Sequence, residues 1–234
     1  MVGLSVVIPI GPQEHEAGRL IGDLLLLPPD SEILFVLGGD PAHFPLRPGI
    51  ERCLRSRSVR WLQAEVGRAS QQNAGAAAAR GQWLWFLHWD SGFDRRLLHC
   101  LQQQLAQRPE GLHYCQLRFM DDGAGMPALN SWGANLRSRW LGIPFGDQGL
   151  ALSRALFEQL GGFDTRAPYG EDHLLVWAAH HQGVPLIGCE QPLLSSARKY
   201  RQHGWGRLTL CYQWLWLKQA LPQWWRLWWR RVGS

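Results

Sequence analysis

The stretch GQWLWFLHWDSG, residues 81–92, decides the fold prediction for this chain. Residues 83–87 are all large and apolar, which is typical of a strand that is buried on both faces. A buried strand is a rigid support, and Asp90 is the first carboxylate that follows it. The sequence therefore predicts an acidic side chain at the tip of a central strand. The alternative is that Asp90 only caps the helix expected from Asp94.

Short apolar runs alternate with helix-like segments on both sides of this stretch. Strands are expected at residues 4–10, 32–37, 59–62, 83–88 and 113–119, and helices at 15–27, 67–81, 94–108 and 169–183. After about residue 120 the pattern loosens, and it then tightens into a short strand and a helix within residues 146–163. This alternation predicts an α/β fold, an open, mostly parallel, twisted sheet flanked by helices. Ligands of such folds bind beyond the carboxyl ends of the strands.

Composition limits the class of protein. The length of 234 residues fits one α/β domain, residues 1–204, with an appendage at residues 205–234. The net charge of +5 favours an anionic partner, such as a nucleotide, a phosphorylated lipid or an acidic membrane surface. Five cysteines without a CxxC pair fit a reducing cytosol better than a zinc knuckle or a disulfide framework. No basic leader and no spanning apolar run are present, so a cytoplasmic protein is expected, at most peripheral at the inner membrane face.

Five motifs together resemble a known family. They are GRASQQNAGAAAARGQWLWFLHWDS (67–91), GDQG (146–149), LGGFD (160–164), GEDHLL (170–175) and SARKY (196–200). Their order and spacing resemble the family 2 glycosyltransferases of the GT-A fold, especially a small bacterial subgroup of transferases associated with radical SAM and selenodomain proteins. The resemblance implies a GT-A-like fold and transfer of a sugar from a nucleotide-diphosphate donor to an acceptor hydroxyl, with inversion.

The resemblance also implies a divalent cation, Mg²⁺ or Mn²⁺, at the end of the strand expected at residues 83–88. A diphosphate leaving group must be neutralised as it departs, and such a cation does this. Asp90 matches the metal-binding aspartate of the family, whose usual DxD pattern is reduced here to His88, Trp89 and Asp90. His88 is a second candidate ligand or a donor to phosphate, and its alternative role is to fill the strand end.

An acidic pair opens the helix predicted at residues 169–183. By the resemblance, Asp172 matches the general base, which takes the proton from the acceptor hydroxyl. Glu171 is expected to orient the acceptor or to raise the proton affinity of its neighbour. The alternative is that acids in a first helical turn only complement the helix dipole.

The resemblance assigns further residues to the nucleotide and its phosphates. These candidates are Pro9, Glu16, Arg68, Asn73, Asp147, Gln148 and Arg198, with Arg201 as a further one. Arg68, near a helix N-terminus, can bind phosphate in a fork geometry. The basic loop at 196–201 has a solvated surface role as its alternative.

The nucleotide end departs from the family pattern. Where the family commonly has an aspartate that reads the base, the second expected strand ends in Leu37, and Asp40 follows three residues later. A leucine side chain accepts no hydrogen bond, so the base of the donor stays open. The first loop is also longer than the usual form, and Glu14 competes with Glu16 for the matching position.

The C-terminus is rich in tryptophan, with seven of the 14 tryptophans between residues 205 and 229. One expected helical stripe contains Leu221, Trp224, Trp225, Trp228 and Val232, with Arg226 and Arg230 opposite. Such a helix suits the headgroup layer of a membrane, where a lipid-linked acceptor would be found. Packing on the domain or into a dimer is an equal alternative. Stacking on single-stranded nucleic acid ranks third, and no nucleic-acid partner is expected.

Two other functions stay open. A nucleotidyltransferase would use a similar sheet and metal carboxylate but would release pyrophosphate. A noncatalytic nucleotide-sugar-binding or scaffold protein on the same fold would fit Leu37 and the reduced acidic motif. The GAGMPA segment (123–128) matches a dinucleotide-binding pattern, but Asp121 and Asp122 before it would repel a pyrophosphate. No GxxxxGK[ST], HExxH or GxSxG motif is present, which disfavours common NTPases, zinc proteases and serine hydrolases.

Overall fold

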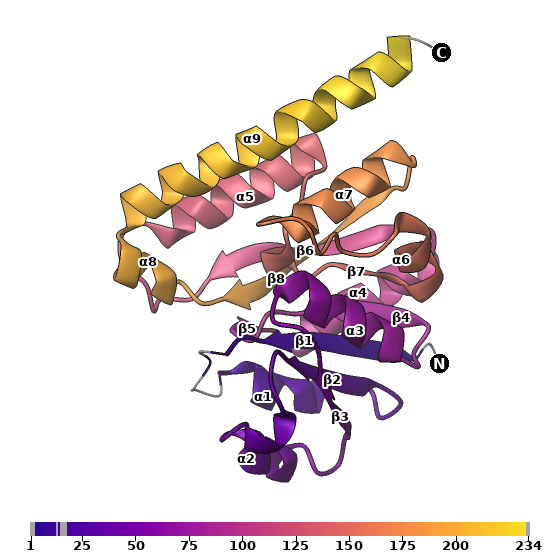
Figure 1. Ribbon diagram of the computed structural model, residues 1–234, viewed down its shortest axis with the longest axis vertical. Helices are drawn as coiled ribbons and strands as arrows, with labels where there is room; N and C mark the ends of the chain where they lie inside the picture. The colour runs from indigo at the N-terminus through magenta and orange to yellow at the C-terminus, as the bar shows by residue number, and fades with distance from the viewer. Residues whose placement is uncertain (1–2, 13, 15–17, 233–234) are drawn as a thin grey trace.

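One mixed sheet organises the computed structural model, which describes residues 3–12, 14 and 18–232 (Figure 1). Its strands, in the order in which they pair, are β3 (Ser58–Gln63), β2 (Glu32–Leu37), β1 (Leu4–Ile10), β4 (Trp83–Phe86), β7 (Ala151–Ser153), β6 (Leu112–Phe119), β8 (Leu186–Ser195) and β5 (Ser91–Gly92). The pairs from β3 to β4 are parallel, β7 runs antiparallel to both its neighbours, and β6 pairs in parallel with β8. The predicted open, mostly parallel α/β sheet is therefore confirmed.

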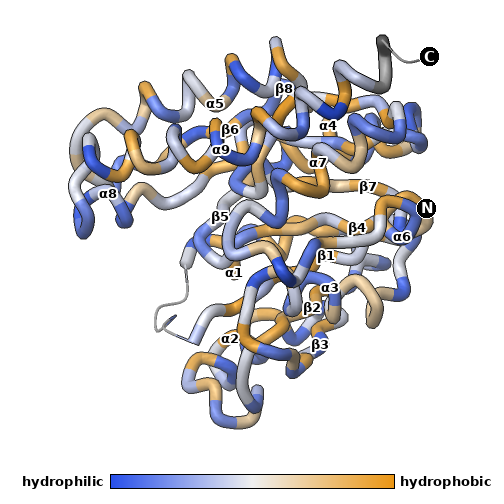
Figure 2. The backbone as a smooth tube through the Cα atoms, turned by 45° about the horizontal axis from the view of Figure 1, so that its top comes forward, coloured by the Kyte–Doolittle hydropathy of each residue, from blue (hydrophilic) through white to orange (hydrophobic). Residues whose placement is uncertain are grey.

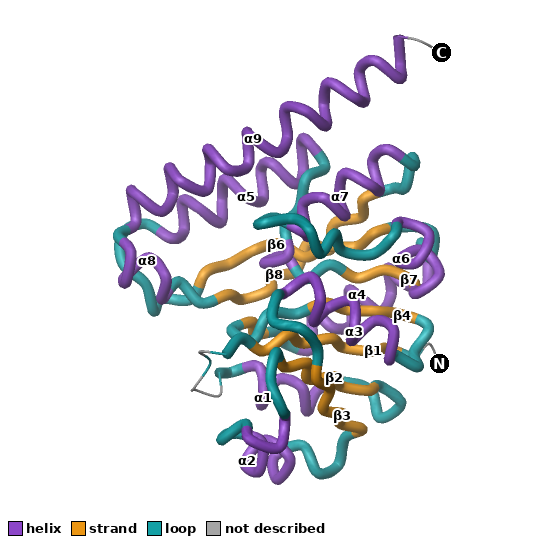
Figure 3. Tube along the Cα trace, viewed as in Figure 1, coloured by secondary structure: helices purple, strands orange, loops and turns teal. Residues whose placement is uncertain are grey.

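Helices cover both faces of this sheet (Figures 1 and 3). The α-helices are α1 (Leu20–Asp23), α2 (Arg47–Cys53), α3 (Arg68–Ala78), α4 (Arg95–Gln107), α5 (Pro127–Leu141), α6 (Arg154–Leu160), α7 (Glu171–His181), α8 (Arg198–His203) and α9 (Trp205–Val232). Short 3₁₀ turns are η1 (Leu24–Leu26), η2 (Pro41–His43) and η3 (Gly146–Gln148).

The apolar run at residues 83–87 is explained by the two faces of the sheet. Trp83 and Trp85 pack into the core under α1 and α4, whereas Leu84 and Phe86 pack into the core under α3, α6 and α7. Successive side chains of a strand point to opposite faces, so a strand covered on both sides is apolar at every position. Asp94 caps α4 by accepting from the backbone N–H of Leu97, which excludes the capping role considered for Asp90.

Several predicted bounds need correction. The strand expected at 83–88 ends at Phe86, so His88 and Asp90 belong to the following loop. The helix expected at 15–27 is described only as α1 and η1, and residues 15–17 lie outside the described residues. Both α5 and β8 are additional elements that the sequence patterns did not predict.

The C-terminal helix packs on the domain along much of its length (Figures 1 and 2). Ala220 is fully buried, and Trp224 meets Trp177 of α7 edge-on, with ring centroids 5.8 Å apart. Trp224 therefore does not share the exposed stripe predicted for it, whereas Leu221, Trp225 and Trp228 are exposed. The side chains of Val232 and Arg230, also expected on this helix, lie outside the described ones. In the part of the chain that is described, no helix has both the length and the hydropathy of a bilayer span.

Candidate active site

A cavity of about 520 Å³ lies between the sheet and the helices α3, α5, α7 and α9. That volume is within the usual range for small-molecule sites, about 300–1,000 Å³. One end is charged and is lined by Arg68, Arg137, Asp147, Glu171, Asp172 and Lys199. The lining also includes apolar and aromatic residues, namely Leu117, Phe119, Ala134, Tyr212, Leu215 and Trp216.

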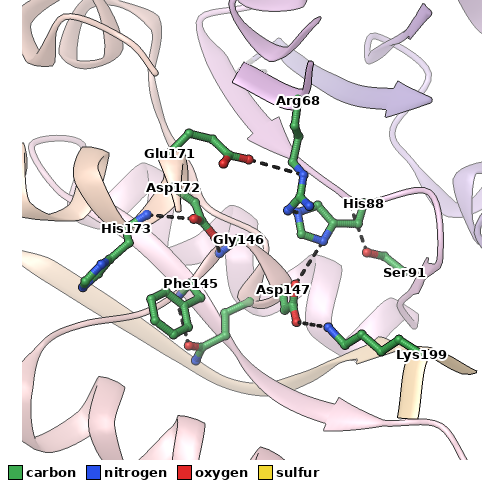
Figure 4. A network of polar contacts seen from close by, with 11 residues as sticks. Arg68, His88, Ser91, Phe145, Gly146, Asp147, Glu171, Asp172, His173 and Lys199 are labelled. Carbon is green, nitrogen blue, oxygen red and sulfur yellow. Dashed lines mark hydrogen bonds and ion pairs between the residues drawn. The ribbon is translucent and has the colours of Figure 1, made fainter. Parts of the chain in front are cut away.

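A chain of polar contacts crosses the charged end (Figure 4). Glu171 Oε1 lies 3.3 Å from Arg68 Nε, and Arg68 Nη1 lies 3.3 Å from His88 Nε2. His88 Nδ1 in turn lies 3.1 Å from Asp147 Oδ1, whose second carboxylate oxygen is 3.5 Å from Lys199 Nζ. Residues from α3, α7, η3, α8 and the loop after β4 thus meet at one place.

The carboxylate of Asp172 is oriented by backbone donors. Its Oδ1 accepts a 2.8 Å hydrogen bond from the N–H of His173, and its Oδ2 accepts from the N–H of Gly146. A Cβ atom at Gly146 would lie 2.6 Å from Asp172 Oδ2 and 3.0 Å from His88 Nε2. Glycine is therefore required for η3 to approach α7 this closely.

The first turn of α7 is tied to α9 through His173. Trp177 Nε1 donates to His173 Nε2 at 2.8 Å, so His173 carries its proton on Nδ1 and donates it to Gln219 Oε1, also at 2.8 Å. Gln219 Nε2 donates to the carbonyl of Tyr169 at 2.7 Å. Burial lowers the pKa of His173, which keeps the ring neutral in this role. The acidic pair is thus positioned partly by the C-terminal helix.

The charged groups differ in how well they are compensated. Burial alone would raise the pKa of Asp147, but Lys199 and His88 hold it well below its usual range. Asp147 correspondingly raises the pKa of Lys199. Burial raises the pKa of Asp90, and the repulsion from Asp147 adds to this although His88 and Lys199 oppose it. Asp90, unlike Asp147, is therefore poorly stabilised in its charged form.

Of the predicted residues, His88 and Asp90 lie beside the charged end without lining the cavity, and the others described below do not line it either. Asn73 donates to the carbonyl of Phe163 at 2.8 Å and accepts from its N–H at 2.9 Å, so it holds the loop before α7 against α3. Gln148 donates to the carbonyl of Cys115 and accepts from the hydroxyl of Ser138. Pro9 is buried within β1. Glu16 lies outside the described residues.

The basic loop contributes a different residue from the one expected. Arg198 and Arg201 are exposed, and Arg198 Nε donates to the Ser196 hydroxyl at 3.1 Å. The next residue, Lys199, lines the cavity. The SARKY motif thus located the segment but not the side chain.

Arg137 was missed altogether. It lies with its guanidinium 4.0 Å from the ring centroid of Phe145, and it lines the same cavity. Burial lowers its pKa to about 10, against the opposing effect of Asp172.

The available side chains limit how a metal cation can bind at the site. Within the described residues, no three His, Cys, Asp or Glu side chains are placed so as to hold a metal ion. His88 faces Arg68 with one ring nitrogen and Asp147 with the other, so it is not poised as a ligand. Asp90 does fit a cation, because its charged form is poorly stabilised without one. Magnesium commonly binds through one or two carboxylates together with substrate phosphates, which matches this set.

The comparisons with known proteins identify the fold. No protein-family model matches the sequence, and no curated protein matches it. Among solved structures, the chain is similar to the mannosyltransferase PcManGT from Pyrobaculum calidifontis, in complex with GDP-Man and Mn²⁺, with a TM-score of 0.66 and 20% identity over 86% of this chain and 59% of that one. S. aureus TarS in complex with UDP-GlcNAc follows, with a TM-score of 0.64 and 16% identity over 83% and 58% of the two chains.

A third similar structure is GalNAc-T7 with UDP, GalNAc and Mn²⁺, which has a TM-score of 0.65 and 15% identity over 84% of this chain and 44% of that one. The chain therefore has the fold of the GT-A glycosyltransferases, as the sequence motifs predicted. It spans less than two thirds of the length of each of these proteins.

Proposed function

We propose that the protein transfers a sugar from a nucleotide-diphosphate donor to an acceptor hydroxyl. The observation that carries this proposal is the charged end of the cavity, which is lined by the cations Arg68 and Lys199 and by the carboxylates of Glu171 and Asp172, with Glu171 3.3 Å from Arg68. Diphosphate binding needs the cations, and removal of a hydroxyl proton needs a carboxylate. Three similar structures hold a nucleotide sugar, or a nucleotide and a sugar, as ligands, which supports the same class of donor.

In this proposal, Arg68 and Lys199 bind the diphosphate. Arg68 begins α3, whose N-terminal dipole also favours an anion. Asp172 is the general base and takes the proton of the acceptor hydroxyl. The acceptor oxygen forms a bond to the anomeric carbon as the bond from that carbon to the β-phosphate oxygen breaks, and the nucleoside diphosphate leaves with the electron pair. One displacement of this kind inverts the anomeric centre.

A Mg²⁺ or Mn²⁺ ion would be held by Asp90 together with the donor. When bound, it would neutralise charge that develops on the departing diphosphate. Asp147 stays paired with the Lys199 ammonium and with His88 Nδ1, and it holds both side chains in place. Arg137, whose ring contact fixes it beside Phe145, is a further candidate for a phosphate or acceptor contact.

The proposal is tested by donor turnover. Purified protein with Mn²⁺ is incubated with a panel of nucleotide sugars, and released nucleoside diphosphate is measured, including the slow hydrolysis in which water is the acceptor. Asp172→Asn is expected to lower turnover by about 10²–10⁴-fold while donor affinity is kept, because a general base contributes that much. Asp164→Asn, a change to an acid that pairs only with nearby Arg166, is the matched control and should stay active.

Other outcomes would contradict the proposal. Release of pyrophosphate from nucleotide substrates would identify a nucleotidyltransferase. Absence of any thermal shift with every nucleotide tested would identify a noncatalytic protein. Full activity of Asp172→Asn would remove this residue from the role of base.

A further inference from the structure

The side of α9 that faces away from the domain carries an apolar stripe. Its large residues follow one another at spacings of three or four, which places them on one helical face. They are Leu210, Trp214, Leu217, Leu221, Trp225 and Trp228, with exposed fractions from 42% to 73%. Trp216, Ala220 and Trp224 lie on the adjoining side of the helix and pack against the core. The side chains of the stripe are therefore not needed for packing within the domain.

A second stripe runs along α5. It consists of Leu129, Trp132, Leu136 and Trp140, with exposed fractions from 41% to 76%. Ala134 and Ser138 face inward on this helix. The sequence patterns predicted neither α5 nor its part in an apolar surface.

The two helices lie side by side in the same direction (Figures 1 and 2). Asn130 of α5 bonds to Thr209 Oγ1 and to Trp205 Nε1 of α9. One to two turns further along both helices, the Arg137 guanidinium lies 5.8 Å from the ring centroid of Trp216. The stripes thus cover neighbouring helices at one end of the molecule. We call the ten stripe residues the outer face.

The two helices of the outer face carry charges of a single sign. Neither α5 nor residues 191–234 contain Asp or Glu. Arg139, Arg207, Lys218 and Arg226 are exposed on these two helices, and Lys218 Nζ lies 5.1 Å from the ring centroid of Trp214. A second copy of this chain would bring the same positive charges to the contact and would be repelled. An anionic surface is the complementary partner.

We propose that the outer face docks onto the surface of a bilayer that contains anionic phospholipid. Tryptophan favours the headgroup layer, and each basic residue near such a surface adds to the attraction. Two adjacent amphipathic helices with exposed tryptophans lie in the plane of the interface, since neither is apolar enough to cross it. The docking surface includes α5 as well as the C-terminal helix.

The docking surface indicates that the acceptor is anchored in the membrane, an inference that rests on the proposed function. The inner sides of the same helices line the cavity through Ala134, Arg137, Tyr212 and Trp216. A helix with its side chains is about 10 Å across, so a docked enzyme holds the cavity about one helix diameter from the bilayer. An acceptor that is anchored in the membrane can then reach the cavity, whose lining includes apolar residues of both helices, such as Ala134 and Leu215.

Vesicle binding tests the proposal without any nucleotide. The full chain is sedimented with vesicles of phosphatidylcholine alone and of phosphatidylcholine with 30% phosphatidylglycerol. We expect at least tenfold tighter binding to the anionic vesicles, with a loss of affinity in high salt. Trp140→Gln with Trp225→Gln, and separately Lys218→Glu with Arg226→Glu, should each weaken binding at least tenfold.

The control variant has the same net charge as the variant with two charge reversals on α9, but its substitutions lie on another helix. Arg95→Glu with Arg96→Glu alters two exposed cations on α4 and should leave vesicle binding unchanged. None of the four substituted positions on α5 and α9 lines the cavity, so donor hydrolysis should be unchanged in these variants, and the thermal midpoint checks that they fold. Absence of donor hydrolysis by wild-type protein would contradict the proposed function and would leave the vesicle result unaffected.

Three outcomes would overturn the docking proposal. One is equal binding, or none, to the two vesicle types. Another is equal loss of binding in the α4 control. The third is a concentration-dependent dimer, seen by sedimentation velocity, that the tryptophan variants abolish, because the outer face would then belong to a second copy.

Discussion

At the scale of single residues, two carboxylates of the site differ in how well their surroundings stabilise the charged form. Asp147 is held between Lys199 and His88, whereas burial raises the pKa of Asp90. The difference fits a division of roles, because Asp147 organises the cations and Asp90 needs a cation of its own. A buried carboxylate that lacks its cation is expected to lower the stability of the ligand-free protein.

Asp90→Asn should therefore raise the thermal midpoint of the ligand-free protein at pH 7. A carboxyl whose pKa is raised in the folded state favours folding while it is protonated, and that contribution is lost as pH rises from the unfolded-state pKa through the raised one. Asparagine does not ionise, so the variant does not lose this stability as pH rises. The difference in thermal midpoint between the variant and wild type should therefore disappear at low pH. The same variant should show no Mn²⁺-dependent shift. A lower midpoint at pH 7 would show that the charged form is stabilised by the fold.

Gly146→Ala tests the close approach of η3 to α7. The added Cβ would lie 2.6 Å from Asp172 Oδ2, so we expect donor turnover to fall at least tenfold as the base is displaced. Gly133→Ala on α5 is the matched control, because nothing lies within 4 Å of its Cβ position. There the change should stabilise the protein by about 0.5–1 kcal/mol. Wild-type turnover in Gly146→Ala would contradict the geometry described for Asp172.

Sequence patterns located the cavity acids and Arg68 well because each occurs in a motif at an element boundary. They missed Lys199 by one position, since a motif does not state which of two adjacent basic side chains turns inward. Arg137 gave no signal, because its place in the cavity depends on the ring of Phe145, the carbonyl of Ile143 and the position of α5 over the sheet.

At the scale of elements, α9 combines two roles on opposite faces. Its inner face closes the cavity and holds the first turn of α7 through Gln219, while its outer face is the proposed docking surface. Truncation before residue 205 would remove both and expose the core, so single substitutions are the appropriate test. Adjacent residues on a helix point in different directions, which supplies a matched pair.

Trp224→Ala should destabilise the protein by about 3 kcal/mol, because its ring packs on Trp177 and Trp216 and leaves a cavity when removed. Trp225→Ala, at a residue that is 62% exposed, should change stability by less than about 0.5 kcal/mol. Chemical denaturation measures both. Equal effects of the two changes would mean that α9 does not pack in the orientation described.

Two elements were beyond sequence patterns for identifiable reasons. The α5 sequence contains glycine, serine and asparagine, which have low helix propensity, and its exposed face is as apolar as its buried face. In β8, Pro192 and a register shift opposite Cys115 and Gln116 interrupt the alternation that marks a strand. Tertiary contacts with β6 decide both structures.

At the scale of the whole molecule, the parallel half of the sheet and the mixed half meet at the cavity. The parallel half was predictable, because its strands are short, continuous apolar runs that end in loop residues. At the carboxyl end of β2, Leu37 is buried in the core and Asp40 accepts from the N–H of Ala42, so neither side chain takes the place expected of a base-reading aspartate. Under the proposed function, other groups would recognise the base, and a donor panel that spans different bases tests this.

The most direct test of the central claim is a crystal structure of the protein with a nucleoside diphosphate and Mn²⁺. The account predicts the diphosphate against Arg68 and Lys199, and an anomalous signal from manganese in contact with the Asp90 carboxylate. A nucleotide bound elsewhere, or a manganese ion that contacts the phosphates but not Asp90, would contradict it.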